Sequence, residues 1–118
     1  TRVLLVGAGV GVTPLRALLE DLPSSTDVVC VLRARTVDEI PHLDEIRRLV
    51  ERRDGRVHVL TGTRDEVRME QALPGAVPDI AGRDIYVCGP TGFTGAVADT
   101  ARRWGADPDQ IHAEAFAF

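Results

Sequence analysis

Apolar residues along this 118-residue chain gather in short, nearly continuous runs separated by stretches with helical periodicity. Continuous runs rich in Val, Leu and Ile are typical of strands buried on both faces, because a half-exposed strand alternates apolar and polar residues. The pattern predicts five strands: Arg2–Gly7, Asp27–Arg33, Arg56–Thr61, Asp84–Cys88 and Gln110–Ala115.

Between these runs, apolar residues recur at helical spacing. Helices are predicted at Thr13–Leu22, from about Pro41 and at Thr91–Trp104. Gly62–Asp79, with Pro74, Gly75 and Pro78 as breakers, is predicted to be irregular or weakly helical. Alternating strands and helices indicate an α/β domain with a parallel sheet covered on both faces. Ligands of such sheets bind outside the carboxyl ends of the strands, so the residues following each strand are the candidates for function.

The first strand runs into a glycine-rich turn that closes on Thr-Pro. Gly7, Gly9 and Gly11 are predicted to let the backbone turn tightly and approach a ligand. Thr13 is predicted to cap the following helix and Pro14 to occupy its first position, which leaves free N–H groups for an anion such as a phosphate. The pattern is G-x-G-x-x-P, which departs from the usual dinucleotide fingerprint at its third glycine. The alternative is a purely structural corner.

The second strand is followed by two arginines and a threonine, Arg33, Arg35 and Thr36. NAD-binding folds usually place a carboxylate there to hold the ribose 2′-hydroxyl. Guanidinium groups suit a 2′-phosphate instead, which favours NADPH and leaves NADH as the second choice. The alternative is that the arginines form surface ion pairs with Asp38 or Glu39.

The fourth strand ends in a second glycine turn, Cys88-Gly89-Pro90, with Thr91 as the predicted cap of the next helix. A cysteine at a strand end offers a small, polarizable side chain against which a ring can pack. It can also be a buried structural residue, or a nucleophile with His112 as its base.

The remaining two strand ends carry weaker signals. Thr61–Arg64 offers hydroxyl and guanidinium groups to the same adenosine end, or forms a plain turn. Glu114 precedes Phe116 and Phe118, and an aromatic side chain there either stacks on a flat cofactor or packs as core.

Composition narrows the function classes. The net charge of −4 provides no basic footprint for nucleic acid. No apolar run reaches membrane-spanning length and no signal peptide opens the chain. The two cysteines lie far apart and lack metal-ligand spacing, which favours a reducing compartment and no bound metal. Thr1 leads straight into the first strand, which suggests a cut inside a longer protein.

Three motifs together resemble the C-terminal nicotinamide-binding domain of the ferredoxin–NADP reductase superfamily, and most closely its ferric reductase and NADPH oxidase-like branch. They are Gly9-Val10-Gly11-Val12-Thr13-Pro14, Cys88-Gly89-Pro90 and Glu114-Ala115-Phe116. The resemblance implies that residues 1–118 form one NAD(P)H-binding domain, a Rossmann-like three-layer α/β sandwich whose five parallel strands have the order 3-2-1-4-5.

The resemblance also implies a reaction, namely hydride transfer from NADPH to FAD or FMN and then single-electron transfer to haem, an iron–sulfur centre, ferric iron or oxygen. Cys88 and Glu114 are expected to flank the nicotinamide as the catalytic residues. The expected cofactor-binding residues are Gly9, Val10, Gly11, Val12, Thr13, Pro14, Arg33, Arg35, Thr36, Gly89, Pro90, Thr91 and Phe116.

The flavin motif of that family, an Arg-x-Tyr-Ser/Thr type of run, does not occur in these residues. The expected partner is therefore a flavin-binding domain in the same longer chain, with a membrane haem domain before it in one branch, and the isolated domain is expected to be inactive. It would lie in the cytoplasm or form the cytosolic part of a membrane protein. A non-catalytic regulatory module and a stand-alone Rossmann dehydrogenase core are the alternatives. A stand-alone dehydrogenase predicts a substrate domain or a Tyr/Lys catalytic pair. The chain has no such pair, because its only tyrosine, Tyr86, lies inside a predicted strand.

Overall fold

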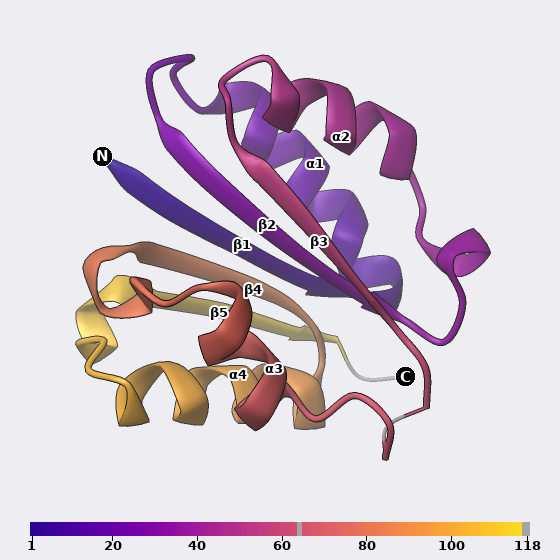
Figure 1. The fold of residues 1–118 in the computed structure, drawn as a ribbon, viewed down its shortest axis with the longest axis vertical. Coiled ribbons are helices and arrows are strands. Elements are labelled where there is room, and N and C mark those ends of the chain that lie inside the picture. Colours follow the sequence, from indigo (N-terminus) through magenta and orange to yellow (C-terminus); the bar gives the residue numbers. More distant parts are fainter. Residues whose placement is uncertain (64, 117–118) are drawn as a thin grey trace.

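The computed structural model describes residues 1–63 and 65–116, the last of them by its backbone only. Five parallel strands form one sheet of order β3-β2-β1-β4-β5, as predicted (Figure 1). Their bounds are β1 Arg2–Ala8, β2 Asp27–Ala34, β3 Arg56–Thr61, β4 Asp84–Pro90 and β5 Ile111–Phe116.

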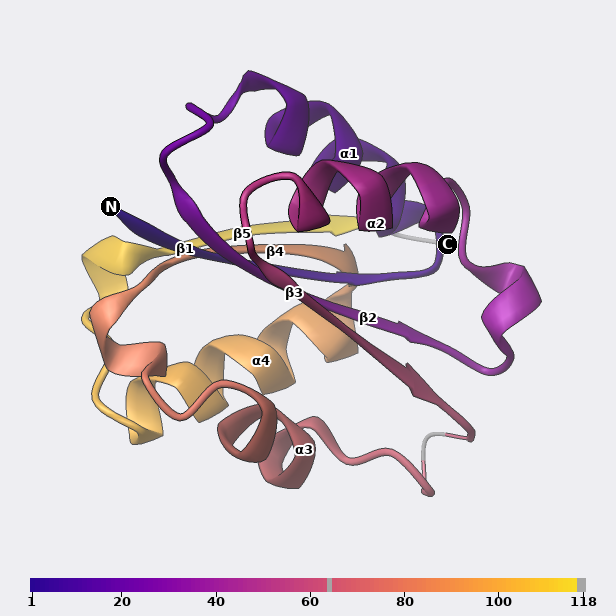
Figure 2. The ribbon, with the colours of Figure 1, turned by 45° about the horizontal axis from the view of Figure 1, so that its top comes forward.

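Two helices cover each face of the sheet, which gives the predicted three layers (Figure 2). Helices α1 (Val12–Asp21) and α2 (Leu43–Glu51) lie on one face, and α3 (Met69–Ala76) and α4 (Thr91–Arg103) lie on the other. Short 3₁₀ turns join the elements: η1 Gly9–Gly11, η2 Val37–Glu39, η3 Ile80–Gly82 and η4 Pro108–Gln110.

Alternate residues of the central strands supply the two cores, because successive side chains of a strand point to opposite faces. Leu5 and Leu32 are buried under α1 and α2, whereas Leu4 and Val31 are buried against α3 and α4. The apolar side of α2 faces the core, with Ile46 and Val50 fully buried. Burial on both faces explains why these strands read as continuous apolar runs in the sequence.

The two predicted threonine caps are wrong. Thr13 and Pro14 lie inside the first turn of α1, whose N-cap is Gly11 with no side-chain cap. The reason is that η1 continues directly into α1, with the Val12 N–H donating to carbonyls of the glycine turn, so no extended residue is left to act as a cap. Thr91 is the first residue of α4, after an extended Pro90, and again makes no side-chain cap.

The segment 62–79 contains a full helix, α3, in spite of Pro74. Proline lacks an N–H and clashes with the preceding turn, and it is most disruptive in the middle of a helix. Here it stands near the end of an eight-residue helix, and Met69 and Leu73 are buried in the core. Tertiary burial of these two side chains thus outweighs the local signal from proline.

The charged side chain of Arg53 is held by main-chain carbonyls. Its guanidinium donates to the carbonyls of Leu19 and Leu22 at 3.4 Å each and of Pro23 at 2.7 Å. These carbonyls belong to the last turn of α1 and the residues after it, which have no intrahelical donor. Arg53 therefore caps the C-terminus of α1 from the end of α2.

We expect Arg53→Ala to lower the free energy of unfolding by about 1–2 kcal/mol, because the carbonyls lose a charged donor. Urea unfolding followed by circular dichroism measures the change. Arg52→Ala is the matched control, since Arg52 is the exposed neighbour. Equal losses in the two variants would contradict the capping role.

None of the helices that the structure describes is long and apolar enough to cross a membrane.

Candidate functional site at the strand ends

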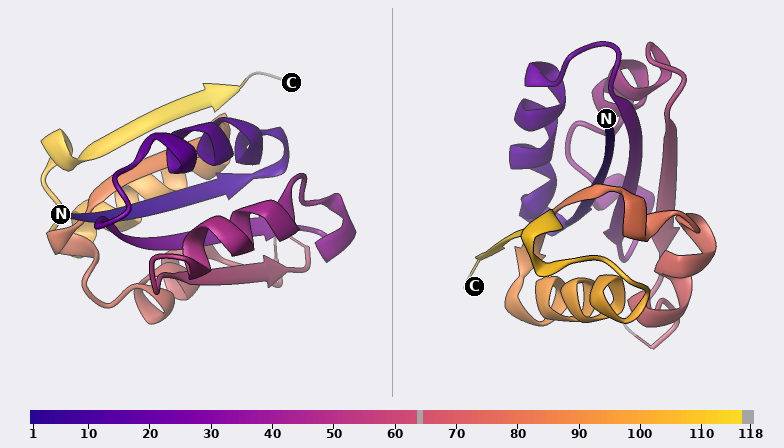
Figure 3. Two further views of the ribbon diagram at one scale, coloured as in Figure 1. Left: turned by 90° about the horizontal axis from the view of Figure 1, so that it is seen from above. Right: turned by 90° about the vertical axis from the view of Figure 1, so that its left-hand side faces the viewer.

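The carboxyl ends of all five strands lie along one edge of the sheet, as the parallel pairing requires (Figure 3). In the register, Gly7 of β1 lies opposite Cys88 of β4, and Cys88 lies opposite Glu114 of β5. On the other side of β1, Ala8 pairs with Arg33 of β2. Folding therefore brings the glycine turn, the cysteine turn, Glu114 and the arginines to one edge, as the sequence predicts.

The three glycines differ in what lies beside them. Gly9 is left-handed, with φ of 58°, and a Cβ placed on it would meet nothing within 4 Å. Gly7 is covered by α1, since a Cβ there would lie 2.6 Å from Leu15 Cδ1. Gly11 is covered by β4, because a Cβ there would collide with the Cys88 carbonyl. Gly7 and Gly11 are needed for packing within the protein.

The contact at Gly11 joins the two glycine turns. Its Cα faces the backbone between Cys88 and Gly89, which leaves no room for a side chain. Gly89 in turn lies against Ala8 and the ring of Phe93, where a Cβ would come within 2.9 Å of Phe93 Cδ2. The turn after β1 and the turn after β4 therefore hold each other in place.

Cys88 is 7% exposed, and Glu114 opposite it is exposed. Burial, and secondarily the negative charge of Glu114, raise the pKa of the Cys88 thiol above its ordinary value. His112, the base that a nucleophilic cysteine would require, lies opposite Tyr86, and the two rings stack with centroids 4.6 Å apart. A neutral thiol without a positioned base does not suit a nucleophile.

Cys30 fits the structural alternative that the sequence left open for cysteine. It is fully buried in β2, and burial raises the pKa of its thiol to about 12. Neither cysteine is in a disulfide.

A hollow of about 480 Å³ opens at the ends of β2 and β3, and we call it the β2–β3 hollow. It is lined by Ala8, Gly9, Arg33, Ala34, Arg35, Glu39, Gly62, Thr63 and Pro90. Within the part of the chain that the structure describes, neither Arg33 nor Arg35 forms an ion pair, so the predicted alternative of surface ion pairs with Asp38 or Glu39 is wrong. Thr36 does not line this hollow, although its carbonyl accepts a hydrogen bond from the Glu39 N–H.

A second hollow of about 380 Å³, the α3–α4 hollow, opens on the other face. It is lined by Ala8, Arg33, Asp65, Val67, Arg68, Met69, Glu70, Pro90, Gly92, Phe93 and Ala96. The two hollows share Ala8, Arg33 and Pro90 and so adjoin each other. The sequence analysis did not identify the apolar side chains of Val67, Met69 and Phe93 as candidates for binding. Only Phe93 could have been found, because it follows the Cys88-Gly89-Pro90 turn by three residues.

The turn after β3 is closed on itself. The Thr63 N–H donates to the Glu66 carboxylate at 2.9 Å, and the Glu66 N–H donates to the Thr63 hydroxyl at 3.3 Å. The bonds from Thr63 lower the pKa of the Glu66 carboxyl. This favours the plain-turn alternative for Thr61–Arg64, although Arg64 itself lies outside the described residues, as does Phe118. The backbone of Phe116 pairs with Pro90.

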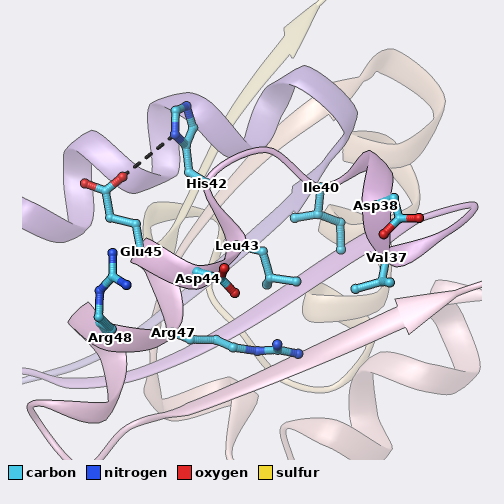
Figure 4. Close-up of a pocket in the computed structure, with 9 residues that line it drawn as sticks. All are labelled: Val37, Asp38, Ile40, His42, Leu43, Asp44, Glu45, Arg47 and Arg48. Carbon is cyan, nitrogen blue, oxygen red and sulfur yellow. Dashed lines mark ion pairs between the residues drawn. The ribbon is translucent and has the colours of Figure 1, made fainter.

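A further hollow, of about 520 Å³, lies elsewhere, between η2 and the start of α2 (Figure 4). It is lined by Val37, Asp38, Ile40, His42, Leu43, Asp44, Glu45, Arg47 and Arg48. Glu45 is already held by Arg16 at 2.5 Å and faces His42 at 3.8 Å. This hollow mixes three carboxylates with two arginines, and none of the residues that line it belongs to a glycine turn or a strand end. We therefore place the candidate site at the strand ends instead. Among residues 1–63 and 65–116, no group of three or more His, Cys, Asp or Glu is arranged to hold a metal ion.

Comparisons with known proteins show which proteins this chain resembles. The family model described as the oxidoreductase NAD-binding domain matches residues 5–99. The glycine betaine monooxygenase reductase subunit of Chromohalobacter salexigens is 31% identical over 129 aligned positions, which cover 98% of this chain and 35% of that protein. The vanillate O-demethylase oxidoreductase of a Pseudomonas species is 31% identical over 117 positions, with 98% and 36% covered. The chain thus spans about a third of the length of these relatives.

Among solved structures, the flavohem-like FAD/NAD-binding domain of nitric oxide dioxygenase from Vibrio cholerae superposes with a TM-score of 0.82 at 27% identity, covering 97% of this chain and 50% of that one. Sequence match, fold and strand-end geometry agree with the resemblance stated above. The chain belongs to the oxidoreductase NAD-binding domain family of ferredoxin reductase-like proteins.

Proposed function

We propose that this chain binds NADPH along the carboxyl edge of its sheet and presents the nicotinamide to a flavin held by another domain of a longer protein. One observation carries the proposal: the open turn at Gly9, the Cys88–Glu114 pair and two arginines that form no ion pair among the described residues all lie along that edge. The length of the relatives and the combined FAD/NAD-binding domain of the similar structure support a flavin-binding partner domain.

The pyrophosphate is proposed to lie at the turn Gly9–Gly11 and the start of α1. The N–H groups at the start of a helix point outward and favour an anion. The first turn of α1 contains no acidic residue that would repel it. The open space beside Gly9 allows the ligand to approach the backbone directly.

The adenosine end is proposed to occupy both hollows. The α3–α4 hollow offers the apolar surfaces of Val67, Met69 and Phe93 to a flat ring. The β2–β3 hollow offers Arg33 and Arg35 to a 2′-phosphate, for which guanidinium groups are the suited partners. Because Arg33 lines both hollows, one nucleoside phosphate can fill them together.

The nicotinamide is proposed to lie over Cys88 with Glu114 beside it. The buried thiol provides a polarizable surface for the ring, and the exposed carboxylate can accept a hydrogen bond from the carboxamide or hold a proton. Bound NADPH would supply the hydride that reduces the flavin, and the flavin would supply single electrons to an acceptor such as haem or an iron–sulfur centre. The protein's contribution is to orient the ring and exclude water. A membrane haem domain and the cytoplasmic location stay predictions.

Calorimetric titration of the full-length protein with 2′-phospho-AMP and AMP tests the proposal. We expect Arg35→Ala and Arg33→Ala each to weaken 2′-phospho-AMP about tenfold, because a charged hydrogen bond to the phosphate is lost, and to affect AMP less. Arg103→Ala removes the same charge from an exposed position at the far end of α4 and should change neither affinity. Absence of binding of both nucleotides would refute the NAD(P)H site, whereas equal affinities in the unmodified protein would refute only the preference for NADPH.

A further inference from the structure

We infer that Glu39 is a specificity-determining residue that opposes a 2′-phosphate in the β2–β3 hollow and so keeps NADH usable beside NADPH. Glu39 lines the same hollow as Arg33 and Arg35, and no role in binding was predicted for it from the sequence. The inference rests on the proposed function and deepens it, because it concerns how the hollow chooses between the two nucleotides.

The backbone fixes Glu39 relative to the arginines. Glu39 is the last residue of η2, and its N–H donates to the Thr36 carbonyl at 3.2 Å. The next residue, Ile40, is 6% exposed and packs into the core under α1 and α2. Glu39 is thus held between the end of β2 and a buried anchor, even though its own side chain is exposed.

The charge of Glu39 is not neutralised by the arginines it accompanies. Within the described residues, Glu39 forms no ion pair with Arg33 or Arg35. A ligand in the hollow therefore meets two positive charges and one negative charge. A 2′-phosphate, which as a phosphate monoester carries roughly −1.5 to −2 at neutral pH, is attracted by the arginines and repelled by the carboxylate.

A ribose 2′-hydroxyl in the same hollow interacts favourably with the carboxylate and gains little from the arginines. It carries no charge for the arginines to attract, but it can donate a hydrogen bond to a carboxylate. NAD-binding folds use an Asp or Glu near the end of the second strand in this way. Here the end of β2 provides arginines, which favour a 2′-phosphate, and η2 provides a carboxylate, which favours a 2′-hydroxyl. Glu39 therefore reduces the preference of the hollow for the 2′-phosphate.

The test is Glu39→Gln in the full-length protein, titrated with 2′-phospho-AMP and with AMP at low and at physiological ionic strength. Gln keeps the size and removes the charge. We expect 2′-phospho-AMP to bind about two- to fivefold more tightly, because one exposed negative charge that repels the phosphate is removed. The affinity for AMP should stay unchanged or fall. The gain should shrink as salt rises, because salt screens exposed charges.

Glu51→Gln is the matched control, since it removes an equal charge from an exposed residue at the C-terminal end of α2, outside the β2–β3 hollow. A change in the ratio of the two affinities that is confined to Glu39→Gln supports the inference. An unchanged ratio, an equal change for both nucleotides, or the same shift in Glu51→Gln would overturn it while leaving the proposed function intact. Absence of nucleotide binding by the unmodified protein would overturn both.

Discussion

Replacing Cys88 with alanine is expected to slow the reduction of bound flavin by NADPH about 10- to 100-fold in the full-length protein and to change the affinity for NADPH much less. The size follows from geometry, since a reacting ring displaced by a fraction of an ångström loses up to about two orders of magnitude in rate. Stopped-flow absorbance of the flavin measures the reduction, and calorimetry with NADP⁺ measures binding.

The reason for this split is the place of Cys88 in the turn. Its backbone is locked against Gly11 and its neighbour Gly89 against Phe93, so the alanine variant keeps the turn and loses only the sulfur. Binding energy from the pyrophosphate and adenosine ends remains, but the ring loses the surface that orients it. Because the pKa of the Cys88 thiol is raised, the reduction rate should not follow a thiolate titration between pH 6 and 8.

Cys30→Ala is the control for loss of a buried sulfur. Cys30 lies in β2, away from the strand ends, and its removal is expected to cost stability without changing the rate of flavin reduction. If Cys88→Ala reduces flavin at the unmodified rate, the role of Cys88 at the nicotinamide is refuted. Equal slowing in both variants would instead indicate a general loss of packing.

The sheet could be predicted from the sequence because each strand is buried on both faces and is bounded by turn residues. The residues Val28 to Leu32, for example, are buried without a break and read as one apolar run. Helix α3 was harder to predict, because Pro74 signals a break while the burial of Met69 and Leu73 depends on contacts with other elements. Local propensity is overridden in this way wherever tertiary burial decides.

That the candidate residues gather on one edge was predictable, because parallel strands bring their carboxyl ends together, which places Gly9, Arg33 and Cys88 side by side along the sheet. The sequence could not predict which glycines of the turn are open and which are covered by the rest of the protein. Spacing cannot show that Gly11 faces Cys88, since that contact joins residues far apart in the chain. The apolar wall of the α3–α4 hollow is likewise assembled from α3 and α4, so residues such as Phe93 become visible as site residues only in the fold.

Replacing Arg83 with methionine is expected to lower the free energy of unfolding by about 3 kcal/mol at neutral pH, the largest stability effect predicted for this chain. Arg83 is 4% exposed, and its guanidinium donates to the Val3 carbonyl at 3.0 Å, to the Asp79 carboxylate at 3.0 Å and to the carbonyl and carboxylate of Asp27 at 3.3 Å. It therefore joins β1 and β2 at the amino edge of the sheet, opposite the site. Methionine fills similar space but leaves the buried Val3 carbonyl without its donor, and urea unfolding measures the cost.

The same substitution should change how stability depends on pH. The hydrogen bond from Arg83 is the main reason that the pKa of Asp79 is lowered in the folded protein, with Arg2 contributing less. A carboxyl whose pKa is lower when folded adds stability that is fully present above its unfolded pKa and is lost as the pH falls through its folded pKa. The unmodified protein should therefore lose this contribution on acidification below about pH 4, the ordinary range for an Asp. Arg83→Met should lose less stability over that range, whereas the exposed control Arg103→Met should follow the unmodified protein. If the free energy of unfolding falls equally with pH in all three proteins, Arg83 is not the cause of the lowered pKa of Asp79.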